Sequence, residues 1–409
     1  MRRIFREALQ RIPQYRVYLY CTTDQLTAQY QRLDVATFHT LPYPVHPFFR
    51  EKPLPQRPGH PARIACLGHS RREKGYRQLP AVVRSLWADY LKTGRAQLLL
   101  QTRRRDLRRP LDTIVADLGM HSATPPVTYA EFPLALDRYA ALVRSADLGL
   151  LLYDSARYYA RCSGVLLEML SAGVPVVVPA GGWLSEQFAE ENQRYLESLV
   201  SSSDVVQRLS ARALAWALPV EGMKNSSHLG EALVLERDLP AICEFTLPAA
   251  VRSLLLRFRW CEPRSAGTYV RMTLDQFDAK GAAIAKFGMI EGPRAGDGHV
   301  HTLFRIDERA SVARIAWSNA WAQDRISLDS IEFFLLGAPS HPAGAVGLAA
   351  AEADDSVVLA HEILEHLDHY TARAAAFATR CAEHHNADQI IAVLIGVAGA
   401  DLQRSQLAG

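Results

Sequence analysis

The sequence predicts an α/β fold with a doubly wound parallel sheet, an antiparallel β-sandwich and a helical region after it. Three observations support it. From residue 63 to about residue 200, short apolar segments alternate with helix-length segments, which predicts parallel strands joined by right-handed helical crossovers. Between about residues 221 and 337, apolar side chains recur at every second position between turn residues, as is typical of a sandwich. After Pro342 the helical period returns.

The first part of the chain predicts a helix, a strand at 16–21, a helix at 23–33 and a strand that ends in the sequence LPYPV. These elements amount to about one and a half βα units, too few to close a sheet of their own. Residues 42–61 are rich in proline and basic side chains, as is typical of a linker.

The alternating region that follows predicts five strands, at 63–67, 96–101, 126–130, 148–153 and 175–179. Ligands of such sheets bind beyond the carboxyl ends of the strands, so the loops after the strands are where binding residues are expected.

One of these regions, residues 158–183, predicts a loop, a short helix, a buried strand and a glycine turn. The helix is expected to begin at Ser163 and Gly164, and the turn is formed by Gly181 and Gly182. A helix N-terminus exposes unpaired N–H groups and a positive dipole end, so it suits an anion such as a diphosphate.

Glu168 lies on this helix among apolar neighbours, so its carboxylate needs a partner. A ribose diol, a backbone cap or an arginine would each serve. A structural ion-pair network is the alternative to a ligand.

The loop after the first strand of the alternating region has the sequence GHSRREKGYRQL. Gly68 allows a tight exit from the strand, and Lys74 precedes the next helix. The chemistry alone leaves two interpretations open, a phosphate-binding loop and a solvated basic turn.

The segment SGVLLEMLSAGVPVVV, followed by GG, resembles the donor-binding signature of the group 1 glycosyltransferases of the family 4 type, which have the two-domain GT-B fold with Rossmann-like halves. The resemblance implies that Glu168 holds the ribose of a nucleotide sugar. It also places the backbone of Ser163 and Gly164 beside the diphosphate, with Gly181 and Gly182 in the same donor site.

The loop at Gly68 supports this resemblance, because the family uses a lysine and an arginine there to bind the diphosphate. Lys74 matches the lysine. The family's arginine falls at His69, so Arg71 or Arg72 would replace it, and Arg71 is preferred.

The chain departs from the family at the earlier of two glutamates, where it has Ala160. The neighbouring Arg161 would then bind phosphate. The resemblance therefore implies catalytic roles for Glu168, Lys74 and Arg161.

The resemblance also implies a division of the chain. Residues 1–54 correspond to the end of an acceptor-binding domain and its hinge, and residues 55–200 and 341–409 to a discontinuous nucleotide-sugar domain. The inserted sandwich, 201–340, is a candidate carbohydrate-binding module. We expect the chain to be a fragment, or a partner polypeptide to supply the acceptor domain.

The expected function is transfer of a sugar from a nucleotide-sugar donor to a saccharide or lipid-linked acceptor, without metal or cofactor. The alternative is a non-catalytic glycan-binding or scaffolding protein with a degenerate donor site. A GT-B epimerase or phosphorylase is a third option.

The aromatic side chains of the sandwich region have two interpretations as well, a sugar-stacking platform and an ordinary core. They are Trp260, Tyr269, Phe277, Phe304, Trp317 and Trp321.

Composition argues against several other classes of protein. A net charge of +3 gives no reason to expect a nucleic-acid partner, and six scattered cysteines without a C-x-x-C pair fit a reducing cytoplasm. No apolar run reaches the roughly 18 residues of a membrane span. Five arginines between Arg103 and Arg109 either contact an anionic acceptor or membrane surface, or form an exposed loop ahead of a helix at Pro110.

The sequence HEILEH, 361–366, resembles a zinc-binding motif, but its histidines are five residues apart and so lie on different sides of a helix. No metal site is expected.

Overall fold

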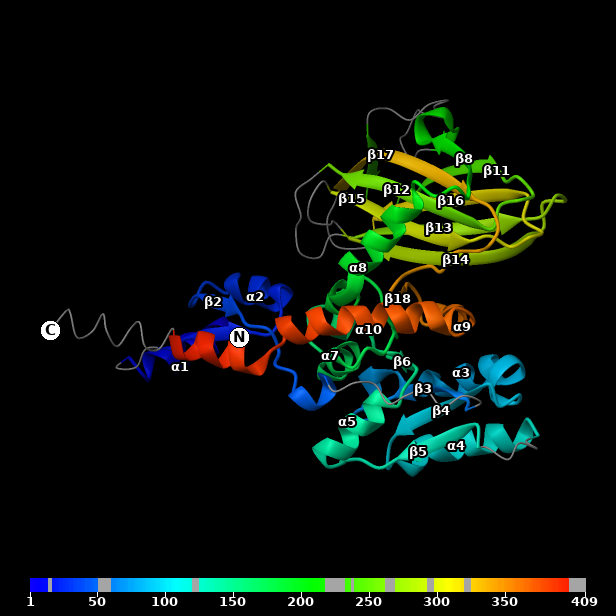
Figure 1. Cartoon of the computed structure of the whole chain (residues 1–409). Helices are drawn as coiled ribbons and strands as arrows, with labels where there is room; N and C mark the ends of the chain where they lie inside the picture. Colours follow the sequence, from blue (N-terminus) through cyan, green and yellow to red (C-terminus); the bar gives the residue numbers. More distant parts are fainter. Residues whose placement is uncertain are drawn as a thin grey trace.

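The computed structural model describes residues 1–13, 17–50, 60–119, 125–217, 232–236, 239–261, 269–292, 298–319 and 325–396. Figure 1 shows a parallel-sheet half in the lower part of the view and a β-sandwich above it, with helix α8 (Trp183–Leu199) between them. A small N-terminal unit lies at the left of the view.

The lower half contains a six-stranded parallel sheet with the strand order β18-β7-β6-β3-β4-β5. Its strands are β3 (Ala62–Cys66), β4 (Ala96–Gln101), β5 (Val127–Ala130), β6 (Leu148–Leu150), β7 (Val176–Pro179) and β18 (Gly347–Ala350). The predicted fold class, α/β with a parallel sheet and antiparallel sheets, is confirmed.

Helices cover both faces of this sheet, and each face has its own apolar core. One core includes α3 (Leu79–Leu86), η4 (Trp87–Leu91), α4 (Arg105–Asp117) and α9 (Asp355–Glu365). The other includes α5 (Leu136–Arg144), α7 (Gly164–Ser171), α8 and α10 (Leu367–His384). Both cores need long runs of apolar residues in the strands, because a parallel sheet is buried on its two faces.

The sandwich lies in the sequence between two neighbouring strands of the parallel sheet. β18 pairs in parallel with β7, and Gly347 is opposite Val176. All strands of the two antiparallel sheets come between these residues. The predicted domain limits at 54, 200 and 340 stay predictions.

Two five-stranded antiparallel sheets form the sandwich. One contains β8 (Val205–Ser210), β10 (Leu233–Glu236), β12 (Ser253–Trp260), β15 (His299–Arg305) and β17 (Arg325–Leu336). The other contains β9 (Trp216–Ala217), β11 (Ala241–Thr246), β13 (Val270–Phe277), β14 (Ala283–Glu291) and β16 (Val312–Asn319). Side chains of both sheets share one core, in which the ring of Phe258 meets Trp317 edge to face at 5.4 Å.

This core takes up the aromatic side chains that a sugar-stacking platform would need. Four of the six are buried, namely Trp260, Tyr269, Phe304 and Trp317. Phe277 is partly buried below the guanidinium group of Arg314, and Trp321 lies outside the described residues. Trp260, Phe304 and Trp317 therefore belong to the sandwich core, and the hydroxyl of Tyr269 donates to Glu186 instead.

The N-terminal unit consists of α1 (Arg2–Gln10), α2 (Asp24–Gln31) and the two parallel strands β1 (Leu19–Cys21) and β2 (Phe38–Thr40). Of the predicted linker at 42–61, residues 51–59 lie outside the described part. The segment before them includes η1 (Pro47–Arg50). Its Val45 forms a parallel β-bridge with Asn386, just beyond the C-terminal end of α10.

Helix α4 corrects one prediction. It begins at Arg105 and contains Pro110, so the arginines do not form a loop that ends at the proline. Leu111 and Ile114 are buried on this helix, and their burial offsets the hydrogen bond that the proline cannot donate. Arg108 donates to the carbonyl of Thr102 and is partly buried.

In the described part of the chain, no helix combines the length and the apolar character needed to cross a bilayer.

Candidate functional site at the start of helix α7

The loop after β3 is fixed against helix α7 by Gly68. Its backbone has φ +90°, and a Cβ there would lie 2.9 Å from Val165 Cγ2 and 3.0 Å from Lys74 Nζ. Gln101, at the end of β4, accepts a hydrogen bond from the Gly68 N–H at 2.8 Å. Only glycine fits this position, and it brings the Lys74 amine to the first turn of α7.

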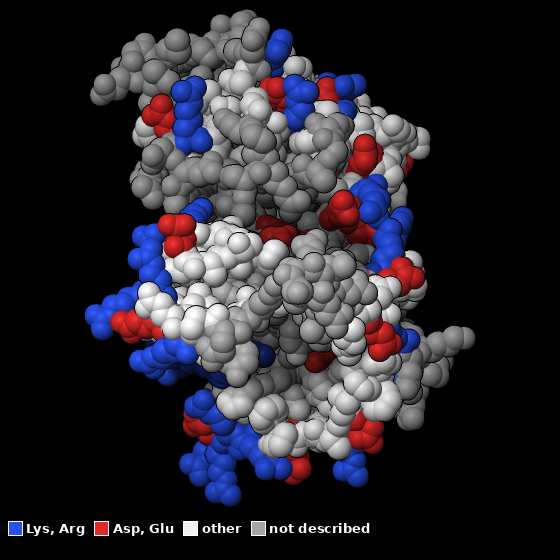
Figure 2. Space-filling view, turned by 90° about the vertical axis from the view of Figure 1, so that its left-hand side faces the viewer, with Lys and Arg blue, Asp and Glu red and all other residues white. Residues whose placement is uncertain are grey.

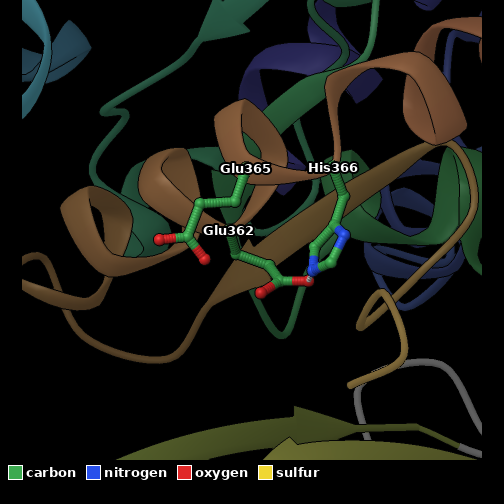
Figure 3. A group of neighbouring side chains, drawn as sticks. All are labelled: Glu362, Glu365 and His366. Carbon is green, nitrogen blue, oxygen red and sulfur yellow. Dashed lines mark ion pairs between the residues drawn. The ribbon is translucent and has the colours of Figure 1, made fainter. Parts of the chain in front are cut away.

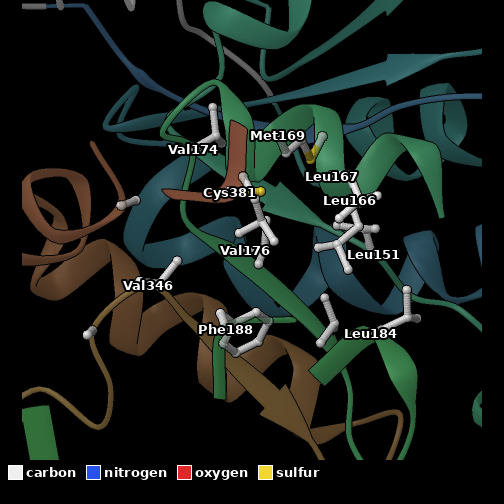
Figure 4. Packing of buried hydrophobic residues seen from close by; sticks show 14 of the residues in the cluster. Leu151, Leu166, Leu167, Met169, Val174, Val176, Leu184, Phe188, Val346 and Cys381 are labelled. Carbon is white, nitrogen blue, oxygen red and sulfur yellow. The ribbon is translucent and has the colours of Figure 1, made fainter. Parts of the chain in front are cut away.

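Helix α7 begins as predicted, with Ser163 as its N-cap. The Ser163 hydroxyl accepts a hydrogen bond from Leu166 N at 3.3 Å and donates one to the Tyr153 hydroxyl at 3.3 Å. A Cβ at Gly164 would lie 3.2 Å from the hydroxyl of Tyr43, so a residue of the N-terminal segment lies against the start of the helix. Figure 4 shows the apolar side of α7 packed into the core, with Leu166, Leu167 and Met169 labelled.

Lys74 holds a charge in an unfavourable environment. Its Nζ lies 4.9 Å from the centroid of the Tyr153 ring. Burial and, after it, the Arg71 guanidinium together lower the pKa of this amine to about 8, although Glu168 and Glu73 act in the opposite direction. At neutral pH the amine is still charged, and a bound anion would stabilise it.

Glu168 has a partner that the sequence did not reveal. The hydroxyl of Tyr139, on α5, donates to its Oε2 at 2.8 Å. Burial raises the pKa of the Glu168 carboxyl, and Tyr139 and then Lys74 act to lower it. The expected backbone cap or arginine is therefore replaced by a tyrosine and a lysine. Oε1 accepts no hydrogen bond from the described residues and remains for another donor.

Three predicted arginines lie outside this cluster. Arg71, Arg72 and Arg161 are exposed, and Arg71 Nη1 lies 3.7 Å from Glu73 Oε1. A backbone N–H lowers the pKa of the Glu73 carboxyl, and the guanidinium groups of Arg71, Arg157 and Arg161 lower it further. Arg71 and Arg161 thus lie near Glu73 at the rim, away from the carboxylate of Glu168.

The two glycines after β7 form a separate contact. Gly181 has φ +71°, and Gly182 is the N-cap of α8. A Cβ at Gly182 would lie 3.1 Å from the backbone of Tyr159, and Trp183 N donates to the Tyr159 carbonyl at 3.0 Å. These contacts join the start of α8 to the residue that follows α6 (Ser155–Tyr158).

Ala160 takes part in the contact between the N-terminal unit and the parallel-sheet half. Its carbonyl accepts a hydrogen bond from the buried Thr23 hydroxyl at 2.6 Å. Glu186 on α8 adds a second link, because it accepts from Gln25 of α2 and from Tyr269 of the sandwich. The three parts of the molecule therefore meet beside the start of α7.

A different group of side chains, Glu362, Glu365 and His366, has the composition of a metal site (Figure 3). Their candidate ligand atoms lie within 4.8 Å of one another. The two carboxylates already have partners, since Arg305 Nη1 lies 2.5 Å from Glu365 Oε2 and Glu362 accepts from Ala343 N at 3.1 Å. The ring of His361 packs instead against Tyr90 at 5.0 Å.

No known protein family and no curated protein matches the sequence. Solved structures match parts of it. Sucrose-phosphate synthase from Thermosynechococcus elongatus matches over 42% of this chain and 43% of its own, with 20% identity and a TM-score of 0.32. A glycosyltransferase from Rickettsia africae matches over 49% of this chain and 58% of its own, with 10% identity and a TM-score of 0.35.

An α,α-trehalose-phosphate synthase (UDP-forming) from Burkholderia xenovorans, solved with glucose-6-phosphate, matches over 37% of this chain and 39% of its own. The identity is 17% and the TM-score 0.29. This chain thus covers less than two thirds of each of the three solved chains.

Three tyrosines of the cluster were missed by the sequence reasoning. Tyr139 lies on α5, Tyr43 in the predicted linker, and Tyr153 at the end of a predicted strand. The need of Glu168 for a donor was the only available signal. It did not distinguish one hydroxyl from another.

Proposed function

We propose that this chain binds a nucleotide sugar at the start of α7 and takes part in glycosyl transfer to a saccharide or lipid-linked acceptor. One observation carries the proposal. A charged, partly buried lysine and a glutamate with a free carboxylate oxygen lie together at a helix N-terminus. The site is at the carboxyl edge of a parallel sheet, where such sheets bind their ligands.

In this proposal, the first N–H groups of α7 and the Lys74 amine bind the diphosphate. Glu168 Oε1 accepts a hydrogen bond from the ribose, while Tyr139 holds Oε2. The positive charge stabilises the nucleotide as it leaves the sugar, without a metal ion. Arg71, Arg72 and Arg161 are exposed at the rim, where they can reach the outer phosphate or the acceptor.

The proposal assigns the donor site to residues 55–200 and 341–409. The N-terminal unit, residues 1–54, would then belong to an acceptor-binding domain, which a partner polypeptide would complete. The sandwich, 201–340, is a separate module in this scheme.

A second candidate is a non-catalytic protein that binds the nucleotide sugar. Ala160 favours it, because an alanine without a carboxylate stands where the family it resembles has a glutamate. A transferase and a binding protein share the nucleotide site and differ in turnover.

Isothermal calorimetry with nucleoside diphosphates tests the site. We expect the wild type to bind at least one of them, and Lys74→Met and Glu168→Gln each to weaken binding by more than about tenfold, which is 1.4 kcal/mol. Lys92→Met and Glu383→Gln, at exposed positions elsewhere, are the matched controls. If no nucleotide binds, the proposal is wrong. Release of the nucleotide from a bound nucleotide sugar would then separate the transferase from the binding protein.

A further inference from the structure

The exposed apolar side chains of the described residues are concentrated in two stretches of the sequence. Fifteen large apolar side chains are exposed in the described part of the chain, and eleven of them lie in residues 1–48 and 391–395. The other four are Leu136, Val206, Leu239 and Val358. Scattered apolar residues need no explanation, but a concentration of this kind marks an interaction surface.

The helical residues 387–396, after α10, contribute the most unusual part. Residues 391–396 are six consecutive exposed positions, and their sequence is IAVLIG. Ile391 is 51% and Ile395 66% exposed. An exposed helical segment that is apolar on every side favours an apolar environment that surrounds it.

Helix α1 contributes basic side chains to the same end of the molecule in Figure 1. It is held by Phe5, whose ring contacts Tyr30 at 5.8 Å and Phe38 at 5.7 Å. Ile4, which is 69% exposed, and Arg6 lie on the part of the helix that this contact leaves exposed.

The charges of this helix are only partly neutralised. Arg2 pairs with Asp34, and Arg3 with Glu7. Arg6 and Arg11 have no ion-pair partner among the described residues. Figure 2, which views this end of the molecule, shows a patch of uncharged surface, with Lys and Arg side chains and a smaller number of Asp and Glu side chains along its left margin.

We propose that α1 and residues 387–396 dock this chain onto the surface of an anionic lipid bilayer. The apolar residues 391–396 enter the boundary between head groups and acyl chains, and the arginines of α1 contact the anionic head groups. A second copy of the chain fits less well, because a two-fold interface through α1 would bring its arginines together. The inference goes beyond the proposed function and does not depend on it, since docking needs no nucleotide.

Flotation with lipid vesicles tests this surface on the full chain. We expect binding to vesicles of phosphatidylcholine and phosphatidylglycerol, with little binding to phosphatidylcholine alone and less binding at high salt. The double variant Ile391→Asp and Ile395→Asp should weaken binding by more than about tenfold. Arg6→Ala and Arg11→Ala should each weaken it by about fivefold.

Controls at equally exposed positions isolate the surface. Val358, which is 54% exposed on α9, and Arg84, exposed on α3, lie elsewhere, so Val358→Asp and Arg84→Ala should bind like the wild type. Equal binding by the wild type and the double aspartate variant would overturn the proposal, as would no binding to anionic vesicles. A dimer in light scattering that Ile395→Asp dissociates, without vesicle binding, would assign the surface to a second copy instead.

Discussion

The two halves of the molecule bury different kinds of side chain. The sandwich core is built from aromatic and aliphatic residues such as Phe258, Trp317 and Phe333. The parallel-sheet half also has large apolar cores, but at the start of α7 it partly buries the charged groups of Lys74 and Glu168. Apolar burial stabilises a fold, whereas burial of a charge opposes it. The charges kept at α7 therefore indicate a ligand.

The largest expected effect tests the sandwich side of this comparison. Phe258 is fully buried, so Phe258→Ala should lower the free energy of unfolding by about 3–5 kcal/mol, through lost burial and a cavity. Urea unfolding measures the change. Phe277→Ala, at a partly buried ring, is the control and should lose less. Equal losses from both variants would show that the buried core does not carry the stability of this half.

Lys74 tests the parallel-sheet side of the comparison, where its replacement should raise the free energy of unfolding instead of lowering it. Its pKa is about 8 in the folded chain and 10.5 as a free side chain, so the unfolded state binds more protons between these pH values. The stability of the wild type should therefore rise as the pH increases through this window. Lys74→Met should be more stable than the wild type at pH 7, by up to about 3 kcal/mol, and should lack this rise.

The measurement is the difference between the two unfolding free energies as a function of pH, which removes the contributions of other titrating groups. A variant that is less stable than the wild type at neutral pH would mean that Lys74 is a structural residue. Nucleotide binding should also weaken above about pH 8, where the amine loses its charge.

Tyr139→Phe has the smallest expected effect of the three. It removes the hydrogen bond to Glu168 and should lower the free energy of unfolding by about 1–3 kcal/mol. Burial already raises the pKa of Glu168, so the folded state binds more protons than the unfolded state between the usual pKa and the raised one. The free energy of unfolding should therefore fall as the pH rises through this window. The variant should raise that pKa further and extend the fall to higher pH.

Unfolding at pH 5 and pH 7 measures this effect, with Tyr129→Phe as the matched control. The Tyr129 hydroxyl donates to the exposed Asp112 at 2.6 Å. Tyr129→Phe should therefore lower the free energy of unfolding by less than Tyr139→Phe, and should leave the pH dependence caused by Glu168 unchanged. Identical behaviour of the two variants would remove Tyr139 from the site.

Local chemistry explains which parts of the site the sequence could predict. The start of α7 follows from Ser163 as an N-cap, and the exit of β3 follows from Gly68, because each depends on a few consecutive residues. The partner of Glu168 depends on how α5 packs against α7. Nothing near Tyr139 in the sequence records that contact.

The same distinction applies to the fold. The alternation of strands and helices predicted the parallel sheet, and the alternation of apolar residues predicted most strands of the sandwich. β8 was not predicted, because most of its side chains are exposed and it shows no apolar alternation. The arginines 71, 72 and 161 were placed near the ligand by analogy, and the structure leaves them at the rim.

The pairing of β18 with β7 sets an order of events during synthesis. Val176 emerges from the ribosome long before its partner Gly347 is made, so the edge of β7 stays unpaired while the whole sandwich is translated. The sandwich can fold in that interval and bring the flanking segments together, which shortens the search for the last strand. We expect a chain that ends at residue 346 to resist protease in the sandwich and to be cleaved in the parallel-sheet half. Extension through α9 should protect both.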